Sequence, residues 1–176
     1  MKKLFWIVAL IAVAGCASHP KSGPMAMAML TPTSGSTAQG MVHFTQMPDG
    51  SVEVEADLTG VPPGVHGFHV HDKGDCGDNG NAAGGHFNPT SMAHGAPDAA
   101  SHHAGDFGNV TADAAGAVHT KFTTRAISVT AGAMNNVVDH AIILHANADD
   151  LTSQPSGNAG PRIACGVAQL MMGNGM

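Results

Sequence analysis

The sequence is poor in charged and aromatic side chains. Asp, Glu, Lys and Arg make up 11% of its 176 residues, and it contains no Tyr and a single Trp, whereas an average soluble domain is about a quarter charged. The formal net charge is −6. An acidic chain with few aromatic rings lacks the basic patch and the stacking surfaces of nucleic-acid-binding proteins, which argues against that class of partner. The residues in excess are glycine, with 23 copies, and histidine, with 12.

Helical patterns are also scarce, because Gly and Pro interrupt almost every window of the sequence. Short alternating or apolar segments recur instead. They predict strands over residues 41–45, 52–56, 65–70, 117–122, 141–144 and 163–170. The tripeptide Pro48-Asp49-Gly50 predicts a hairpin turn between the first two. Short strands separated by Gly-rich turns predict one all-β domain, an antiparallel sandwich or barrel.

Two long segments, residues 72–109 and 146–160, show no strand or helix pattern. Unpatterned loops longer than about 15 residues are uncommon in compact domains and are usually functional. The first segment contains a cysteine, four histidines and an aspartate that metals favour: Cys76, His86, His94, His102, His103 and Asp106. We therefore expect the functional residues in these two loops.

The N-terminus has the pattern of an export signal. Two lysines precede an apolar run at residues 4–14, followed by Gly15-Cys16. Eleven residues are too few to span a bilayer, which takes about 20, so residues 1–15 are predicted to be a signal peptide; a buried N-terminal helix is the alternative. The stretch 13–16 resembles a bacterial lipobox, which predicts lipidation of Cys16, with ordinary cleavage nearby as the other option. Lipidation would anchor the protein in the periplasm, and Ala17 favours the outer membrane over the inner one.

Residues 16–36 are predicted to be a lipidated tether that leads into the first strand, and residues 37–176 to be the domain. Within the tether, three methionines alternate as the side chains of a strand would. Thioethers are also soft ligands for Cu(I), so a copper-binding role stays open for the methionines of both ends: Met25, Met27, Met29, Met171, Met172 and Met176.

The cysteine count is three. If Cys16 carries lipid, Cys76 and Cys165 remain as an even pair in an oxidising compartment, which predicts a disulfide between them. The alternative is a pair of thiolate metal ligands. It is the weaker one, because neither cysteine has a second cysteine at a metal-binding spacing.

The histidines form a pattern of their own. His69 and His71 are two residues apart in a predicted strand, so they lie on one face of it, either as half of a four-ligand metal site or as a solvated pair. His145 ends the predicted strand at residues 141–144. In the first long segment, three imidazoles and one carboxylate suit tetrahedral zinc, and they come from His86, His94, His103 and Asp106.

Read in order, these segments resemble the copper/zinc superoxide dismutase family over residues 38–171. The stretches that carry the resemblance are GFHVH (67–71), GDC (74–76), GHFNP (85–89), HAGD (103–106), HANADD (145–150) and GNAGPRIACG (157–166). The resemblance implies a Greek-key antiparallel β-barrel of about eight strands with two long functional loops. It also implies an oxidoreductase that converts superoxide to dioxygen and hydrogen peroxide by alternate reduction and oxidation of one copper ion, beside one structural zinc ion, and so protects the cell envelope.

Carried over by position, the resemblance assigns copper to His69, His71, His86 and His145, and zinc to His86, His94, His103 and Asp106. His86 would bridge both ions and carry a proton, so it is a catalytic residue together with Arg162, which attracts and orients the anion. Asp149 would link a ligand of each metal through their free ring N–H groups, and Cys76 and Cys165 would form the disulfide. His102 competes with its neighbour for the zinc role, and the spacing to Asp106 favours His103.

The sequence departs from the family between His145 and Arg162, where the segment is short and its only charged residues are Asp149 and Asp150. Steering of superoxide would therefore depend on the metals and Arg162. Homodimers occur in the family, so a homodimer is compatible with the resemblance. Two non-enzymatic alternatives remain, a periplasmic copper or zinc carrier on the same fold and a lipoprotein stapled by zinc alone.

Overall fold

The computed structural model describes residues 23–33 and 35–172. The predicted signal peptide and Cys16 lie outside these residues. Within them, no helix is long and apolar enough to cross a membrane.

Nine strands and one short 3-10 helix (Asn81–Ala83) make up the regular structure of the described residues. The strands are β1 (Met25–Pro32), β2 (Gln39–Gln46), β3 (Val52–Thr59), β4 (Gly64–His71), β5 (Asp106–Ala112), β6 (Val118–Thr124), β7 (Ala141–His145), β8 (Arg162–Val167) and β9 (Gln169–Met171). All pairings between them are antiparallel.

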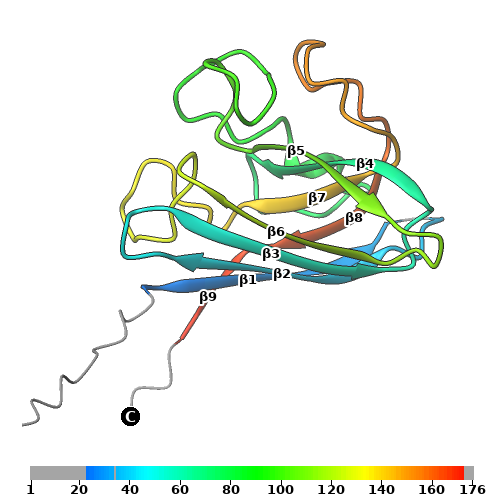
Figure 1. Cartoon of the computed structure of the whole chain (residues 1–176), viewed down its shortest axis with the longest axis horizontal. Helices are drawn as coiled ribbons and strands as arrows, with labels where there is room; N and C mark the ends of the chain where they lie inside the picture. The colour runs from blue at the N-terminus through cyan, green and yellow to red at the C-terminus, as the bar shows by residue number, and fades with distance from the viewer. Residues whose placement is uncertain (1–22, 34, 173–176) are drawn as a thin grey trace, which may run out of the picture.

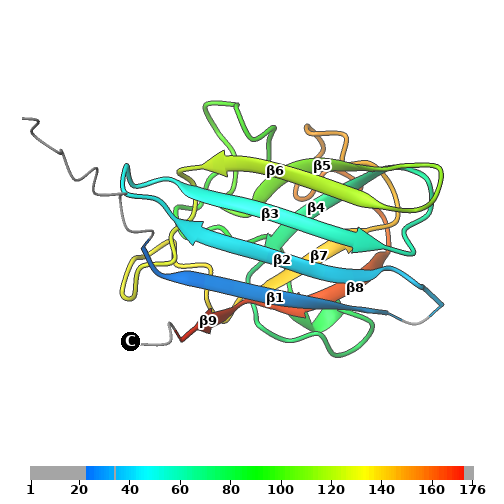
Figure 2. The same ribbon diagram turned by 60° about the horizontal axis from the view of Figure 1, so that its bottom comes forward.

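The strands form two layers that close into a nearly complete barrel (Figures 1 and 2). The hydrogen-bonded order is β5-β4-β7-β8-β1-β2-β3-β6, and β9 pairs with the first residues of β1, Met25 to Met27. The chain crosses from β3 to the β4–β5 hairpin, returns to β6, and crosses again to β7 and β8, which is a Greek-key arrangement. The all-β barrel expected from the sequence is thus confirmed.

Alternation of apolar side chains explains why these strands form a barrel. The inward residues of β1, β2 and β3 are buried in one core that also includes Phe68 and Val70 of β4 and Ile142 and Leu144 of β7. The predicted turn joins β2 to β3, and there Gly50 adopts φ +86°, a conformation that glycine tolerates best. The strand predictions over residues 41–45, 52–56, 65–70, 117–122, 141–144 and 163–170 all fall on observed strands.

Two strands were not expected in full. Met25–Pro32, predicted to be tether and lead-in, is itself strand β1 and pairs with β2 from Met25 to Leu30. Strand β5 begins at Asp106, inside a segment predicted to be unpatterned loop. Met25–Pro32 contains one β-branched residue, Thr31, and no aromatic one, so its strand conformation comes from pairing with neighbours rather than from local preference. In β5, Phe107, Val110 and Thr111 favour a strand, but Gly108, at φ +73°, interrupts the pattern between them.

The long loops that connect β4 to β5 (residues 72–105) and β7 to β8 (residues 146–161) project from the same side of the β5-β4-β7-β8 layer (Figure 1). A third long connection, residues 125–140, joins β6 to β7. The predicted disulfide is present: Cys76 of the first loop is bonded to Cys165 of β8. It packs with Ala83 and Ile143 in a small apolar cluster beneath the loop.

The disulfide should contribute measurably to stability. Its partners are 89 residues apart, so the bond restricts the unfolded chain, and the Cys76→Ser/Cys165→Ser double variant should lose about 2–4 kcal/mol of unfolding free energy. Urea unfolding of the metal-free protein, with and without reductant, measures this. Equal urea midpoints for the variant and the oxidised parent would contradict it.

Candidate metal centre

Strands β4 and β7 place three histidines on the outer side of the barrel. Phe68 and Val70 point into the core, so His69 and His71 point the other way. β7 lies beside β4, and its last residue, His145, follows the inward Leu144 and therefore faces the same side. The loops cover this side, and all three histidines are at most 5% exposed.

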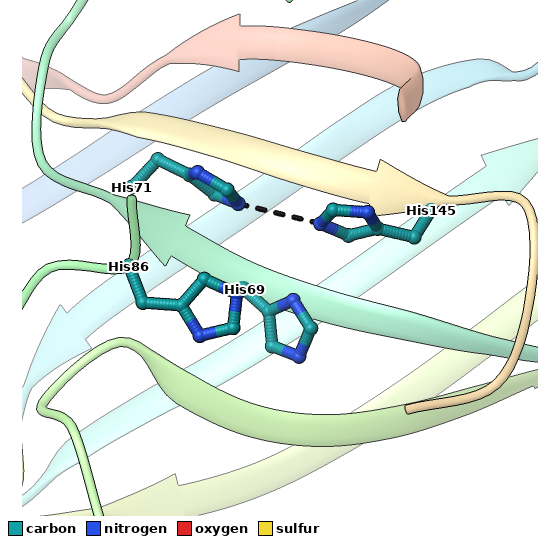
Figure 3. A group of neighbouring side chains, drawn as sticks. All are labelled: His69, His71, His86 and His145. Carbon is teal, nitrogen blue, oxygen red and sulfur yellow. Dashed lines mark hydrogen bonds between the residues drawn. The ribbon is translucent and has the colours of Figure 1, made fainter. Parts of the chain in front are cut away.

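The first long loop brings His86 onto this group. Its backbone forms an isolated bridge with His71, and the next residue, Phe87, donates its N–H to the carbonyl of Val70. The ring of His86 lies 4.1 Å from that of His69, centroid to centroid. Figure 3 shows the four imidazoles converging from β4, β7 and the loop. We call this set the first group: His69, His71, His86 and His145.

A second group shares His86 with the first and consists of His86, His94, His103 and Asp106. In each group, one candidate ligand atom from each residue lies within 4.8 Å of the others. In the second group the three Nδ1 atoms converge on one oxygen, Asp106 Oδ1, at 2.6 Å from His86, 3.0 Å from His94 and 3.2 Å from His103. The structure thus brings together every residue predicted to bind copper or zinc. His102 does not belong to either group; its Nδ1 lies 2.8 Å from the backbone carbonyl of His103.

Hydrogen bonds fix which nitrogen of each ring faces its group. In the first group, Nδ1 of His71 lies 3.0 Å from the Gly84 carbonyl and Nδ1 of His145 lies 3.0 Å from the Gly160 carbonyl. Their Nε2 atoms are therefore directed inward and face each other at 3.3 Å (Figure 3).

Asp149 joins the two groups. Its Oδ2 lies 2.8 Å from Nε2 of His69, in the first group, and its Oδ1 lies 3.0 Å from Nε2 of His94, in the second. Both rings therefore direct their Nδ1 atoms away from Asp149. The predicted position of Asp149, between one histidine of each set, agrees with this geometry.

Three buried ring nitrogens have no hydrogen-bond partner within the described residues: Nδ1 of His69, Nε2 of His86 and Nδ1 of His94, whose approach to Asp106 Oδ1 lacks hydrogen-bond geometry. An unsatisfied buried polar atom destabilises a protein by about 1–3 kcal/mol. The first two belong to the first group and the third to the second. Each is directed into its group, where a bound cation would satisfy it, so both groups fit metal ions.

Arg162, the first residue of β8, lies at the mouth of the first group. Its guanidinium donates hydrogen bonds to the carbonyls of Gly80 and Gly84 in the loop that the disulfide ties to β8. It lines a cavity of about 420 Å³ together with four histidines of the two groups, His71, His86, His103 and His145. Arg162 is the only Lys, Arg, Asp or Glu among the lining residues, so the cavity offers positive charge to a small anion.

The sequence matches the model of one protein family, copper/zinc superoxide dismutase (SODC), over residues 38–168. The chain belongs to this family. An extracellular superoxide dismutase [Cu-Zn] of Haemonchus contortus is 42% identical to it, and the match covers 68% of each chain. A crystal structure of the clock protein EA4 is 38% identical, covers 88% of this chain and 99% of that chain, and superposes with a TM-score of 0.76.

As a copper/zinc superoxide dismutase the protein is an oxidoreductase whose cofactors are copper and zinc. The donor sets suit these ions. Four imidazoles are ligands that copper accepts, and three imidazoles with one carboxylate are a common zinc set. The observed disulfide also excludes the alternative of Cys76 and Cys165 as thiolate ligands.

Two amides that the sequence did not single out hold the groups in place. Asn109 exchanges two hydrogen bonds with the backbone of Asp149, at 2.8 and 2.9 Å. Gln154 does the same for His94, where both hydrogen bonds are 2.9 Å. A clamping amide carries no recognisable motif, because only the folded chain brings it to its partner.

Burial sets the protonation state of the first group. Desolvation lowers the pKa of His69 to about 4 and that of His145 to about 3, and it holds the pKa of His71 well below the ordinary value. These rings are therefore neutral at pH 7, which is the form that binds metals. In the second group, burial raises the pKa of Asp106, but hydrogen bonds from His86 and from the His103 backbone outweigh it, and the carboxyl stays ionised.

The lowered pKa values make the metal-free protein sensitive to acid. His69 has a pKa of about 4 when folded and an ordinary value near 6.5 when unfolded, so the unfolded chain binds more protons between these limits. The unfolding free energy of metal-free protein should therefore be highest above pH 6.5 and fall as the pH decreases toward 4. Urea titrations at several pH values test this, and a free energy that rises over that interval would contradict it.

Asp149 should control how firmly both metals are held. The Asp149→Asn variant removes the charge that orients His69 and His94, and such partners of ligands typically change metal affinity by about 10- to 100-fold. Dialysis against graded chelator followed by metal analysis measures the loss. Asp150→Asn is the matched control, because this exposed carboxylate bonds only to its own loop, at Thr152, Ser153 and Asn158. Equal retention by the two variants would contradict the role of Asp149.

Proposed function

We propose that this superoxide dismutase disproportionates superoxide in the cell envelope, with the first group binding copper and the second binding zinc. Two superoxide ions and two protons give one dioxygen and one hydrogen peroxide. The observation that carries the proposal is the sharing of His86 by two complete groups beside an anion-accepting cavity. A bound copper ion would supply the one-electron redox chemistry, and a zinc ion would hold His86, His94, His103 and Asp106 in position.

The residues of the chain have separate tasks in this reaction. Arg162 binds and orients the anion through the guanidinium that its loop contacts hold in the cavity. His86 is held at Nδ1 by Asp106, and its Nε2 faces the first group, where it can hold a proton for the peroxide product. Asp149 keeps His69 and His94 in the tautomers that direct Nδ1 into their groups.

Export is the second part of the proposal. The predicted signal peptide over residues 1–15 and lipidation at Cys16 would place the domain in the periplasm, anchored to the outer membrane. A disulfide is typical of oxidising compartments, and a relative described as extracellular supports secretion. Mass spectrometry of the mature N-terminus tests this part; an unmodified N-terminus at Met1 would contradict it.

The proposed function is tested on metal-loaded protein by metal analysis together with direct observation of superoxide decay. One copper and one zinc per chain and rapid decay are expected. Replacing His69 with alanine, or removing copper, should abolish the decay, because the copper site then lacks a ligand or its ion. Unchanged decay after either treatment would contradict the proposal, as would a metal content of zinc alone.

The role of Arg162 can be separated from net charge. Arg162→Glu should lower the second-order rate by about tenfold or more while copper is retained, because the cavity loses its cation. Arg125→Glu makes the same change of charge at an exposed residue that binds Asp49, outside that cavity, and should leave the rate nearly unchanged. Equal rates in the two variants would contradict anion binding by Arg162, and loss of copper in Arg162→Glu would instead indicate a structural role.

A further inference from the structure

The other layer of the barrel consists of β1, β2, β3 and β6. Its outer face carries a group of methionines far from the histidine groups in sequence. Five of the 11 methionines of the chain lie on three neighbouring strands, β9, β1 and β2, whose outer face is toward the viewer in Figure 2. They are Met25, Met27, Met29, Met41 and Met171. Their inward neighbours on β1 are Ala26, Ala28 and Leu30, which are buried in the core.

Strand register brings three of these outward methionines together with one histidine. Met27 of β1 is directly opposite His43 of β2, and Met29 is directly opposite Met41. Directly opposed residues have Cβ atoms about 4.5–5.5 Å apart. Met27 and Met29, like Met41 and His43, are two residues apart on one strand and so share the outer face. We call this set the methionine quartet: Met27, Met29, Met41 and His43.

The quartet is accessible to solvent. Met29 is 61% exposed and Met41 is 43% exposed, while Met27 and His43 are half-buried. A shallow hollow lies between Met29 and Met41, at the start of β2, where Gly40 lines it. Within the described residues the ring of His43 has no hydrogen-bond partner, so a nitrogen of this imidazole is available to a ligand.

The chemistry of the quartet is that of a soft cation site. Three thioethers and one imidazole offer four neutral donors, and thioethers select Cu(I) among the biological metals. On the neighbouring strand β3, Glu55 is opposite His43 and Asp57 is opposite Met41, although Lys121 and His119 of β6 already contact these two carboxylates. Ordinary strand surfaces favour β-branched and aromatic residues, so an outward row of methionines is not explained by strand preference.

We propose that the methionine quartet binds one Cu(I) ion per chain, at a site separate from the two histidine groups. Met27, Met29 and Met41 supply sulfur and His43 supplies nitrogen. Met25 and Met171, which are directly opposite each other on β1 and β9, form a neighbouring thioether pair on the same face. The protein would then hold Cu(I) on its surface in addition to the copper ion of its metal centre.

The test uses protein already loaded with copper and zinc and kept reduced, so that its metal centre is filled and diamagnetic. Cu(I) is added anaerobically in competition with a chromogenic Cu(I) chelator, while the ε-methyl groups of 13C-labelled methionines are followed by NMR. We expect one further equivalent to bind and to shift the methyl signals of Met27, Met29 and Met41. The exposed Met92 and Met134, which lie outside the three strands, should not shift.

Three variants make the result decisive. Met27→Leu/Met29→Leu/Met41→Leu preserves volume and apolar character, so the fold should remain while the extra equivalent is lost. Met92→Leu/Met134→Leu is the matched control and should retain it. His43→Gln should weaken binding without removing the methionine shifts entirely. The proposal is overturned if no further equivalent binds, or if the triple leucine variant binds it as well as the control. It is also overturned if the methyl shifts change with protein concentration, as dimerisation would cause, and not with added Cu(I).

Discussion

The imidazole of His86 is common to both buried groups, and the remainder of the site depends on how it is held. Nδ1 of this ring is directed to Asp106 in the second group, while Nε2 faces His69 and the cavity without a hydrogen-bond partner in the described residues. A ring held in this way cannot satisfy both nitrogens with protein atoms alone. Two cations can satisfy both, so a buried polar centre that would otherwise destabilise the fold becomes a binding site.

The two groups combine histidines from barrel strands with histidines from the first long loop. The backbone pairing of β4 with β7 fixes His69, His71 and His145 relative to one another without the help of a bound metal. The loop that carries His86 is tied down by the Cys76–Cys165 disulfide and by its backbone bonds to β4. The same loop supplies the carbonyls that hold the Arg162 guanidinium, so one covalent bond secures the loop that positions both His86 and Arg162.

The sequence predicts the site better than it predicts the strands. The pattern of His and Asp pointed to candidate ligands, the family resemblance assigned each to a metal, and the structure brings every one of them together with its expected group. Strand β1 was missed because pairing across the barrel overrides its weak local preference, and β5 was missed because Gly108 interrupts its pattern. The clamps at Asn109 and Gln154 could not be predicted at all, since each partner is at least 40 residues away and an amide gives no local signal.

The central claim is that His86 serves both metal ions at once, and spin coupling between the ions tests it most directly. Protein is prepared with copper(II) in the first group and paramagnetic cobalt(II) in place of zinc in the second. If one imidazole joins the two ions, the EPR signal of copper(II) should be strongly weakened relative to protein that holds copper and zinc. A copper(II) signal of full intensity, unchanged by cobalt bound at one equivalent per chain, would contradict the account.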